Sequence, residues 1–279
     1  MKNKVMQVDL LKETERQMHQ ILMHQEARDQ YADGEGVFAR ANVADQAVHD
    51  GIELFARLIA NGRRSLFASI YPLAETLLGK KFDALIQAFR ESNKATHYNF
   101  NRQAQGLAQF VEANKNIYAT RYPFLSELIE YEWLELQVIE HEGDLPPASH
   151  CAKDHHSPEE YAALSVQLNP TLIGVDFDYP IQDLIESIQS GEKLPRRFKK
   201  SPCHMVFLRD RDDDQRVVQL GPIARGMIAR CRAKTDLTVG ELLVQVLQDR
   251  ELSEHHGSDL ENLLSIIDDL SEMQAIFLV

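Results

Sequence analysis

A short cluster of metal-ligand residue types lies in the middle of the chain. It comprises His150, Cys151, Asp154, His155 and His156. Imidazole, thiolate and carboxylate groups are the side chains that bind zinc in proteins. A specific zinc site needs a second ligand pair at a defined spacing, and none is evident in the neighbouring sequence. We therefore interpret this stretch as part of a solvated linker and predict no bound metal. The pair His255-His256, in a polar loop, receives the same interpretation.

The motifs of common catalytic sites are not found. The sequence has no G-x-S-x-G, P-loop, glycine-rich dinucleotide turn or H-E-x-x-H pattern. The dense carboxylate run Asp212-Asp213-Asp214 falls where a hairpin turn is expected, so we interpret it as solvated. The sequence thus predicts no catalytic residue and no cofactor. A stand-alone metalloenzyme that uses the His150–His156 cluster is kept as an alternative.

The cysteines and the net charge indicate the cellular compartment and the class of binding partner. Cys151, Cys203 and Cys231 are odd in number and far apart, which is typical of free thiols in a reducing compartment. The net charge of −13 argues against a general nucleic-acid binder, whose affinity comes mainly from phosphate contacts. No stretch approaches the length of a membrane span, and the charged start does not resemble a signal peptide. We expect a cytoplasmic protein with no membrane segment.

One carboxylate stands out because of its surroundings. Apolar residues recur at helical spacing after Pro123, and Glu132 falls in the middle of the resulting apolar face. An unpaired carboxylate is costly in such a place. The first interpretation is a structural ion pair with Arg57, Arg63 or Arg64. The alternatives are a polar contact that fixes the helix where a partner docks, or a catalytic carboxylate.

The first half of the sequence reads as successive helices. Asn61-Gly62 is expected to end or bend a helix of residues 44–61, and Tyr71-Pro72 and Leu78-Gly79 divide residues 63–91 into three helical pieces. A polar helix of residues 8–30 comes before them, and helices of residues 103–113 and from Pro123 follow.

Strands appear in the second half of the sequence. Alternating patterns predict strands near residues 164–168, 173–179, 205–209 and 216–220 and a final strand at 275–279. Thr238-x-x-Glu241 and Ser258-x-x-Glu261 match capping boxes, which begin helices. The predicted fold class is α+β. An N-terminal all-α helical bundle covers residues 1–145, a linker covers 146–160, and a smaller α+β domain covers 161–279 and is winged-helix-like from about residue 203.

Spaced apolar and aromatic positions over about residues 45–140 resemble a known bacterial helical domain. They are Leu58-Ile59-Ala60-Asn61, Tyr71-Pro72, Leu77-Leu78-Gly79, Phe82, Phe89, Tyr122-Pro123-Phe124-Leu125 and Tyr131-Glu132-Trp133-Leu134. The family carries a DNA-binding label and includes accessory subunits, or modification chaperones, of multinuclear non-heme iron oxidative enzymes. One such subunit acts in methanobactin biosynthesis. The resemblance implies a heterodimer with an iron-dependent enzyme that modifies ribosomally made peptides.

The C-terminal region has the element order of a leader-peptide recognition module, a weaker resemblance. A peptide reader offers an exposed edge strand and an adjacent apolar groove. The predicted edge strand is His204–Arg209, with Val206 and Leu208 in it, and Ile266 and Leu270 are the predicted groove residues. The alternative is that Val206, Leu208, Ile266 and Leu270 simply pack on one another. The basic loop Lys193–Lys200 is a further candidate contact for an acidic partner or nucleic acid.

These observations lead to one functional expectation and a runner-up. We expect a non-catalytic adaptor that binds a multinuclear iron-dependent oxidative enzyme and helps recruit its precursor peptide. The runner-up is a DNA-binding transcriptional regulator. It would need a basic recognition helix, whereas both later helices are acidic.

Overall fold

The chain divides into two compact units, residues 1–105 and residues 106–279. The computed structural model describes residues 12, 15–21, 27, 30, 46–92, 101–146, 157–249 and 259–279. Helices combined with two small antiparallel sheets confirm the α+β class. The sequence predicts the division at the linker 146–160, whereas the division in the structure comes before the helix that carries Glu132.

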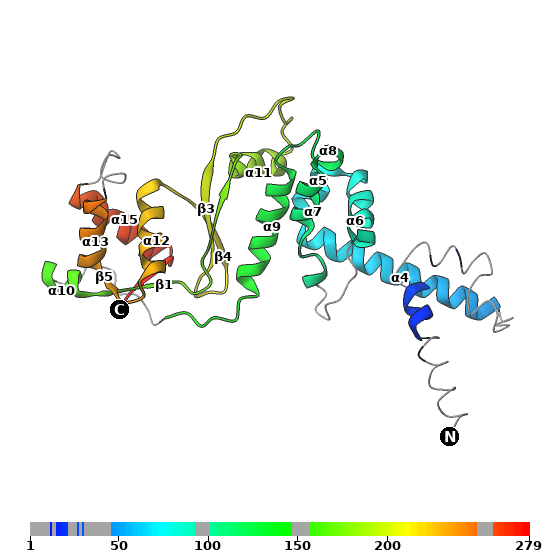
Figure 1. Cartoon of the computed structure of the whole chain (residues 1–279), viewed down its shortest axis with the longest axis horizontal. Helices are drawn as coiled ribbons and strands as arrows, with labels where there is room; N and C mark the ends of the chain where they lie inside the picture. The colour runs from blue at the N-terminus through cyan, green and yellow to red at the C-terminus, as the bar shows by residue number, and fades with distance from the viewer. Residues whose placement is uncertain are drawn as a thin grey trace, which may run out of the picture. The chain divides into compact units, whose positions relative to one another are not determined.

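The first unit is helical in the residues from 46 onward that the structure describes. Its elements are α4 (Gln46–Ile70), α5 (Pro72–Leu78), α6 (Lys80–Ser92) and the 3₁₀ turn η1 (Asn101–Gln103) (Figure 1). Pro72 begins α5, and Gly79 separates α5 from α6 with a φ of 54°. Both predicted breaks in this region are therefore confirmed.

The predicted helix end at Asn61-Gly62 is wrong. Helix α4 continues through Gly62 to Ile70. A single glycine in a helix costs only about 1 kcal/mol, and packing beyond it outweighs that cost. Phe67, one turn and a half further on, is 1% exposed and contacts the Phe89 ring edge to face at a centroid distance of 5.9 Å.

In the described part of the chain, the second unit contains the other helices and all the strands. Its helices are α7 (Leu107–Ala113), α8 (Lys115–Tyr118), α9 (Leu125–Ile139), α10 (Pro158–Ala163), α11 (Ile181–Gln189), α12 (Pro222–Ala233), α13 (Val239–Gln248) and α15 (Leu260–Glu272). Its strands are β1 (Ser165–Leu168), β2 (Ile173–Phe177), β3 (Cys203–Arg209), β4 (Gln215–Leu220), β5 (Leu237–Thr238) and β6 (Ile276–Leu278). The predicted strands are confirmed. Pro123 comes just before the N-cap of α9, Phe124, and so lies outside the helix.

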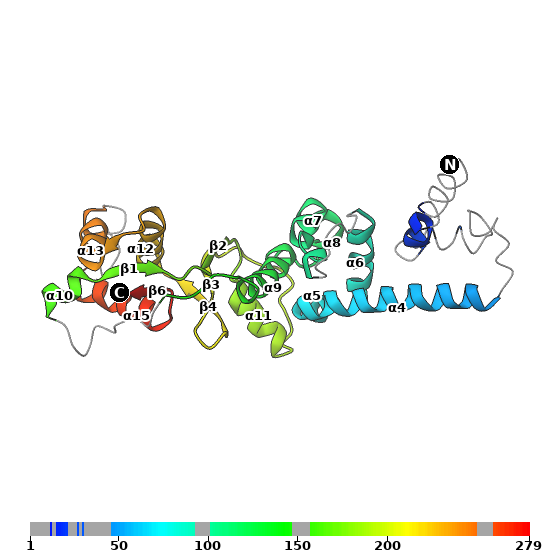
Figure 2. The same ribbon diagram turned by 90° about the horizontal axis from the view of Figure 1, so that it is seen from below.

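The strands form two three-stranded sheets. Figure 2 labels β2, β3 and β4 of one sheet and β1 and β6 of the other. The first has the order β5-β1-β6 and the second the order β2-β3-β4, and all pairs are antiparallel. The hairpin β3–β4 and the closing strand β6 therefore belong to different sheets. The exposed carboxylates Asp212, Asp213 and Asp214 lie in the hairpin turn, as predicted.

Helices cover both faces of the sheet β2-β3-β4. On one face, the Tyr131 ring of α9 meets the Phe207 ring of β3 at a centroid distance of 5.0 Å. On the other face, Val206 and Leu208 belong to one core cluster with Ile223 and Met227 of α12. Successive residues of a strand point to opposite faces, so β3 is buried on both sides.

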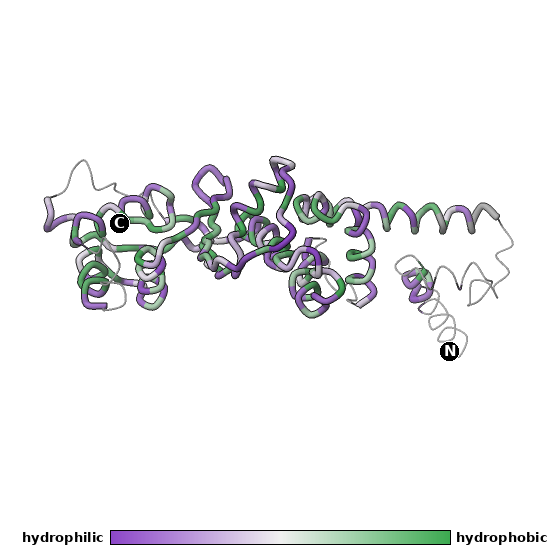
Figure 3. Tube along the Cα trace, turned by 90° about the horizontal axis from the view of Figure 1, so that it is seen from above, coloured by the Kyte–Doolittle hydropathy of each residue, from purple (hydrophilic) through white to green (hydrophobic). Residues whose placement is uncertain are grey.

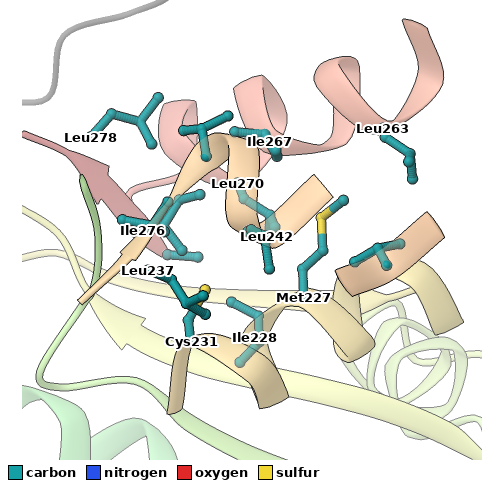
Figure 4. Close-up of a cluster of buried hydrophobic side chains, with 14 of the residues drawn as sticks. Met227, Ile228, Cys231, Leu237, Leu242, Leu263, Ile267, Leu270, Ile276 and Leu278 are labelled. Carbon is teal, nitrogen blue, oxygen red and sulfur yellow. The ribbon is translucent and has the colours of Figure 1, made fainter. Parts of the chain in front are cut away.

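The larger core lies among α12, α13, α15 and the sheet β5-β1-β6. Met227 and Ile228 of α12 meet Leu242 of α13 and Ile267 of α15 in this core (Figure 4). Leu237, Ile276 and Leu278 bring the strands into the same cluster. These side chains hold α12 in place beside the second sheet, and that placement forms the cleft described below.

Helix caps fix the starts of three of these helices. A capping box joins Thr238 and Glu241 at α13, as predicted. Another joins Ser157 and Glu160, so a helix begins inside the stretch predicted to be linker. At α15 the N-cap is Asp259, which accepts a hydrogen bond from the Asn262 amide, so the predicted box starting at Ser258 is wrong. In the parts of the chain that the structure describes, no helix is long and apolar enough to cross a membrane.

Candidate functional site

The strand predicted to receive a peptide is the middle strand of its sheet. β3 pairs with β2 through Gly174↔Val206 and with β4 through Val206↔Val218. Its backbone donors and acceptors are therefore used on both sides, and it cannot accept a further strand. The prediction of an exposed edge at His204–Arg209 is wrong because β2 adds to the side that the hairpin leaves open.

The predicted groove residues are part of the core. Val206, Leu208 and Leu270 are each at most 1% exposed and belong to one cluster, and Ile266 packs against it. The alternative interpretation, in which these four residues pack on one another, is confirmed. Arg209 is also engaged within the chain, because its Nη2 donates to the Gly143 carbonyl at 3.0 Å.

His204, in contrast, lines an open cleft of about 750 Å³ at one end of the sheet β2-β3-β4. The ends of all three strands form one wall, and the first two turns of α12 form the other. The cleft is lined by Asp176, Phe177, Asp178, Pro202, Cys203, His204, Gln219, Leu220, Gly221, Pro222, Arg225, Gly226, Ala229, Arg230 and Asp249. Its volume falls in the range of about 300–1,000 Å³ that is typical of ligand pockets.

A three-residue network crosses this cleft. Asp176 Oδ1 lies 2.9 Å from His204 Nδ1, and Arg225 Nη2 donates to Asp176 Oδ2 at 2.8 Å. Asp176 and His204 are directly paired residues of β2 and β3, and Arg225 reaches them from α12. A Cβ atom at Gly174 would lie 3.1 Å from His204 Nε2, so glycine leaves the imidazole room against the strand. The network thus joins the two walls of the cleft.

Small residues of α12 keep the cleft open. Gly226 and Ala229 lie on the face of α12 that lines it, between Arg225 and Arg230. Arg230 forms an ion pair with Asp249 at the end of α13 and donates to the Gly226 carbonyl at 2.9 Å. The cleft therefore presents hydrogen-bonding side chains of both charges beside the small residues Gly226 and Ala229, an arrangement suited to binding a polar chain segment.

The thiol in the cleft is poorly suited to nucleophilic chemistry. Burial raises the pKa of Cys203, although a backbone hydrogen bond from Ile181 opposes that rise. The thiol also lies 3.4 Å from the Tyr179 carbonyl oxygen. The thiolate is the reactive form of cysteine, so a raised pKa leaves Cys203 protonated near neutral pH. Burial likewise raises the pKa of Cys231, to about 11. Both cysteines are free thiols, as predicted, and Cys151 lies outside the described residues.

One sheet edge next to the cleft is open in the described part of the chain. β4 is the outer strand in the order β2-β3-β4, and Gln215, Arg216 and Gln219 on it are exposed. Gln219 and Leu220, at its end, line the cleft. An extended peptide that pairs with β4 would therefore run directly into the cleft.

Helix α9 carries a buried and a half-buried carboxylate that are not themselves part of the cleft lining. Glu132 is 2% exposed. Of the arginines considered as its partner, Arg64 binds Glu75 and Asp83 at 2.7 and 2.8 Å. Glu127 accepts hydrogen bonds from the amides of Asp178 and Tyr179 at 3.2 and 3.1 Å, and so ties α9 to the end of β2.

The basic loop Lys193–Lys200 is attached to the second unit by its aromatic residue. The Phe198 ring meets the Phe124 ring at a centroid distance of 4.9 Å. Lys200 Nζ lies 2.5 Å from Asp178 Oδ2, so one lysine of the loop balances a neighbouring carboxylate. Lys193, Arg196, Arg197 and Lys199 are exposed.

The predicted histidine clusters, His150–His156 and His255-His256, lie outside the described residues. Among the residues that the structure does describe, no group of three or more histidine, cysteine or acidic side chains could hold a metal ion.

Sequence reasoning missed Asp176, Arg225 and Arg230 as members of one site. They lie on β2 and α12, far apart in sequence, and only the packing of α12 on the sheet brings them together. The sequence did contain a pattern that indicates the central position of β3 in its sheet. Met205-Val206-Phe207-Leu208 is a continuous apolar run, which favours a strand buried on both faces over an exposed edge. The sequence matches no protein-family model and no curated protein.

Proposed function

We propose that this protein is a non-catalytic adaptor that binds a multinuclear iron-dependent oxidative enzyme and helps recruit its ribosomally made precursor peptide. The observation that carries the peptide part of this proposal is the open edge of β4, which leads into the 750 Å³ cleft beside α12. The resemblance of residues 45–140 to accessory subunits supports the enzyme part.

Backbone pairing with β4 would provide affinity and the cleft would provide selection. An added strand gains main-chain hydrogen bonds, and side chains that follow it enter neighbouring pockets. In this proposal the hairpin β3–β4 acts with α12, α13 and α15 as a winged-helix-like reader. Arg225 and Asp176 offer both a donor and an acceptor to the side chains of the peptide.

The test measures peptide and enzyme binding separately, with the full chain and the iron enzyme of the same host. Ala229 is exposed in the cleft, so Ala229→Trp fills it, whereas Ala233→Trp adds the same bulk at the exposed end of α12, outside the lining. We expect Ala229→Trp to weaken binding of a fluorescently labelled precursor peptide at least about 10-fold, while Ala233→Trp leaves binding unchanged.

Copurification measures enzyme binding. Both variants are expected to retain the enzyme at a one-to-one ratio. Equal peptide binding by both variants would overturn the assignment of the cleft. No complex with the enzyme would overturn the adaptor function. A sequence-specific band in a gel-shift assay at physiological salt would instead favour the runner-up, a transcriptional regulator.

A further inference from the structure

Among the residues that the structure describes, helix α4 of the first unit has an apolar face that stays exposed. Leu54, Phe55 and Leu58 are 59%, 56% and 56% exposed. Ile52 and Ala56, which lie toward the other side of the helix, are 7% and 2% exposed, so the inward face is already occupied. Hydrophilic and hydrophobic bands alternate along α4 in Figure 3. Adjacent large apolar side chains that remain exposed are typical of an interaction surface.

The pattern of glycine and large apolar positions on this face is symmetric about its centre, although the apolar residue types differ. The pattern is Gly51-x-x-Leu54-Phe55-x-x-Leu58-Ile59-x-x-Gly62, centred between Ala56 and Arg57. In an interface with two-fold symmetry, residue i meets residue j while j meets i. An antiparallel second copy of α4 would therefore place Phe55 against Leu58, Leu54 against Ile59, and Gly51 against Gly62. The face is complementary to itself.

The two glycines fit the same arrangement. A Cβ atom at Gly51 or Gly62 would meet nothing within 4 Å, so the packing of the monomer does not require glycine at either position. Glycine destabilises a helix interior, but it lets another backbone approach closely.

We infer that α4 forms a homodimer interface in which the face Gly51–Gly62 packs antiparallel on the same face of a second copy of this chain. This surface is separate from the cleft beside α12, and self-association is not part of the proposed adaptor function. The small size of the face fits a reversible dimer with a Kd of about 1–100 µM.

Sedimentation equilibrium of the full chain, over a concentration series spanning that range, tests the association. We expect the mass to rise from 31.9 kDa toward twice that value. Leu58→Asp should weaken association at least about 10-fold, because it places two charges in the apolar contact. Ile117 is 70% exposed on α8, so Ile117→Asp is a matched control that should leave association unchanged. Circular dichroism and Tm measurements check that both variants fold.

Cross-linking tests the register without introducing charge. In a background with Cys151 and Cys203 replaced by serine, Phe55→Cys and Leu58→Cys chains with tags of different size are mixed and mildly oxidised. We expect the mixed 55–58 disulfide to form faster than the 55–55 or 58–58 disulfide. A mass that stays at that of the monomer across the series would overturn the inference. So would a dimer that Leu58→Asp leaves intact, or cross-links with no preference for the mixed pair.

Discussion

Glu135, on α9, is a carboxylate whose charge depends on burial. Desolvation raises the pKa of Glu135 to about 7, although a hydrogen bond with the Tyr131 hydroxyl opposes the rise. Gln215 Nε2 donates to Glu135 Oε1 at 3.0 Å, so the side chain links α9 to β4. Because Glu135 is partly buried, its surroundings favour the neutral carboxyl group over the ionised one.

This shift predicts how stability depends on pH. A folded-state pKa above the unfolded value contributes stability that is full below about pH 4.5 and is lost as pH rises through about 7. Glu135→Gln removes the charge and keeps a similar shape. The variant should therefore have a free energy of unfolding about 1–2 kcal/mol above that of the unmodified chain near pH 8, after allowance for solvent screening. Near pH 5 the difference should be small.

Urea unfolding at both pH values measures this difference. Glu142→Gln, at an exposed carboxylate, is the control and should change stability little at either pH. If Glu135→Gln raised the free energy of unfolding equally at the two pH values, the charge of Glu135 would not be the cause of the increase.

At the scale of elements, two glycines with different backbone geometry have opposite roles. Gly62 lies inside α4 with space around its Cα, whereas Gly79 adopts a φ of 54° between α5 and α6. Gly62→Ala should raise the free energy of unfolding by about 0.5–1 kcal/mol, because alanine favours the helix. Gly79→Ala should lower it by about 1–3 kcal/mol, because an alanine is strained there.

Thermal unfolding of the two variants measures both effects at protein concentrations below the dimer range. A higher stability of Gly79→Ala would mean that the chain turns differently between α5 and α6. A lower stability of Gly62→Ala would mean that α4 ends at residue 62, as the sequence alone predicts.

Local sequence patterns predicted where helices and strands lie better than they predicted which of them pack together. Pro72 and Gly79 act through their own backbone, so the breaks at these positions could be predicted from the sequence. Gly62 could not be assigned in this way, because the continuity of α4 depends on packing beyond it. The central place of β3 and the cleft beside α12 depend on contacts between distant segments, such as Asp176 with Arg225, and these have no local pattern.

At the scale of the whole molecule, the boundary between the two units can be tested by truncation. Helix α9 covers the face of the sheet that carries Met205 and Phe207, both of which are fully buried. The sequence places α9 in the N-terminal domain, whereas the contacts place it with residues 106–279. A chain that begins at residue 146 would expose this face, and each large apolar side chain so uncovered costs about 1.5–3 kcal/mol.

We therefore expect the chain 106–279 to unfold cooperatively and to keep its Tm over repeated scans, while the chain 146–279 unfolds at lower temperature or aggregates. Far-UV circular dichroism is the suitable measurement, since Trp133, the single tryptophan, is present only in the longer fragment. A matched variant, Tyr131→Ala in the chain 106–279, should fall between the two because it removes one ring of the contact. Equal stability of the two fragments would place α9 with the first unit. In that case the sheet β2-β3-β4 would be stable without α9 as a cover.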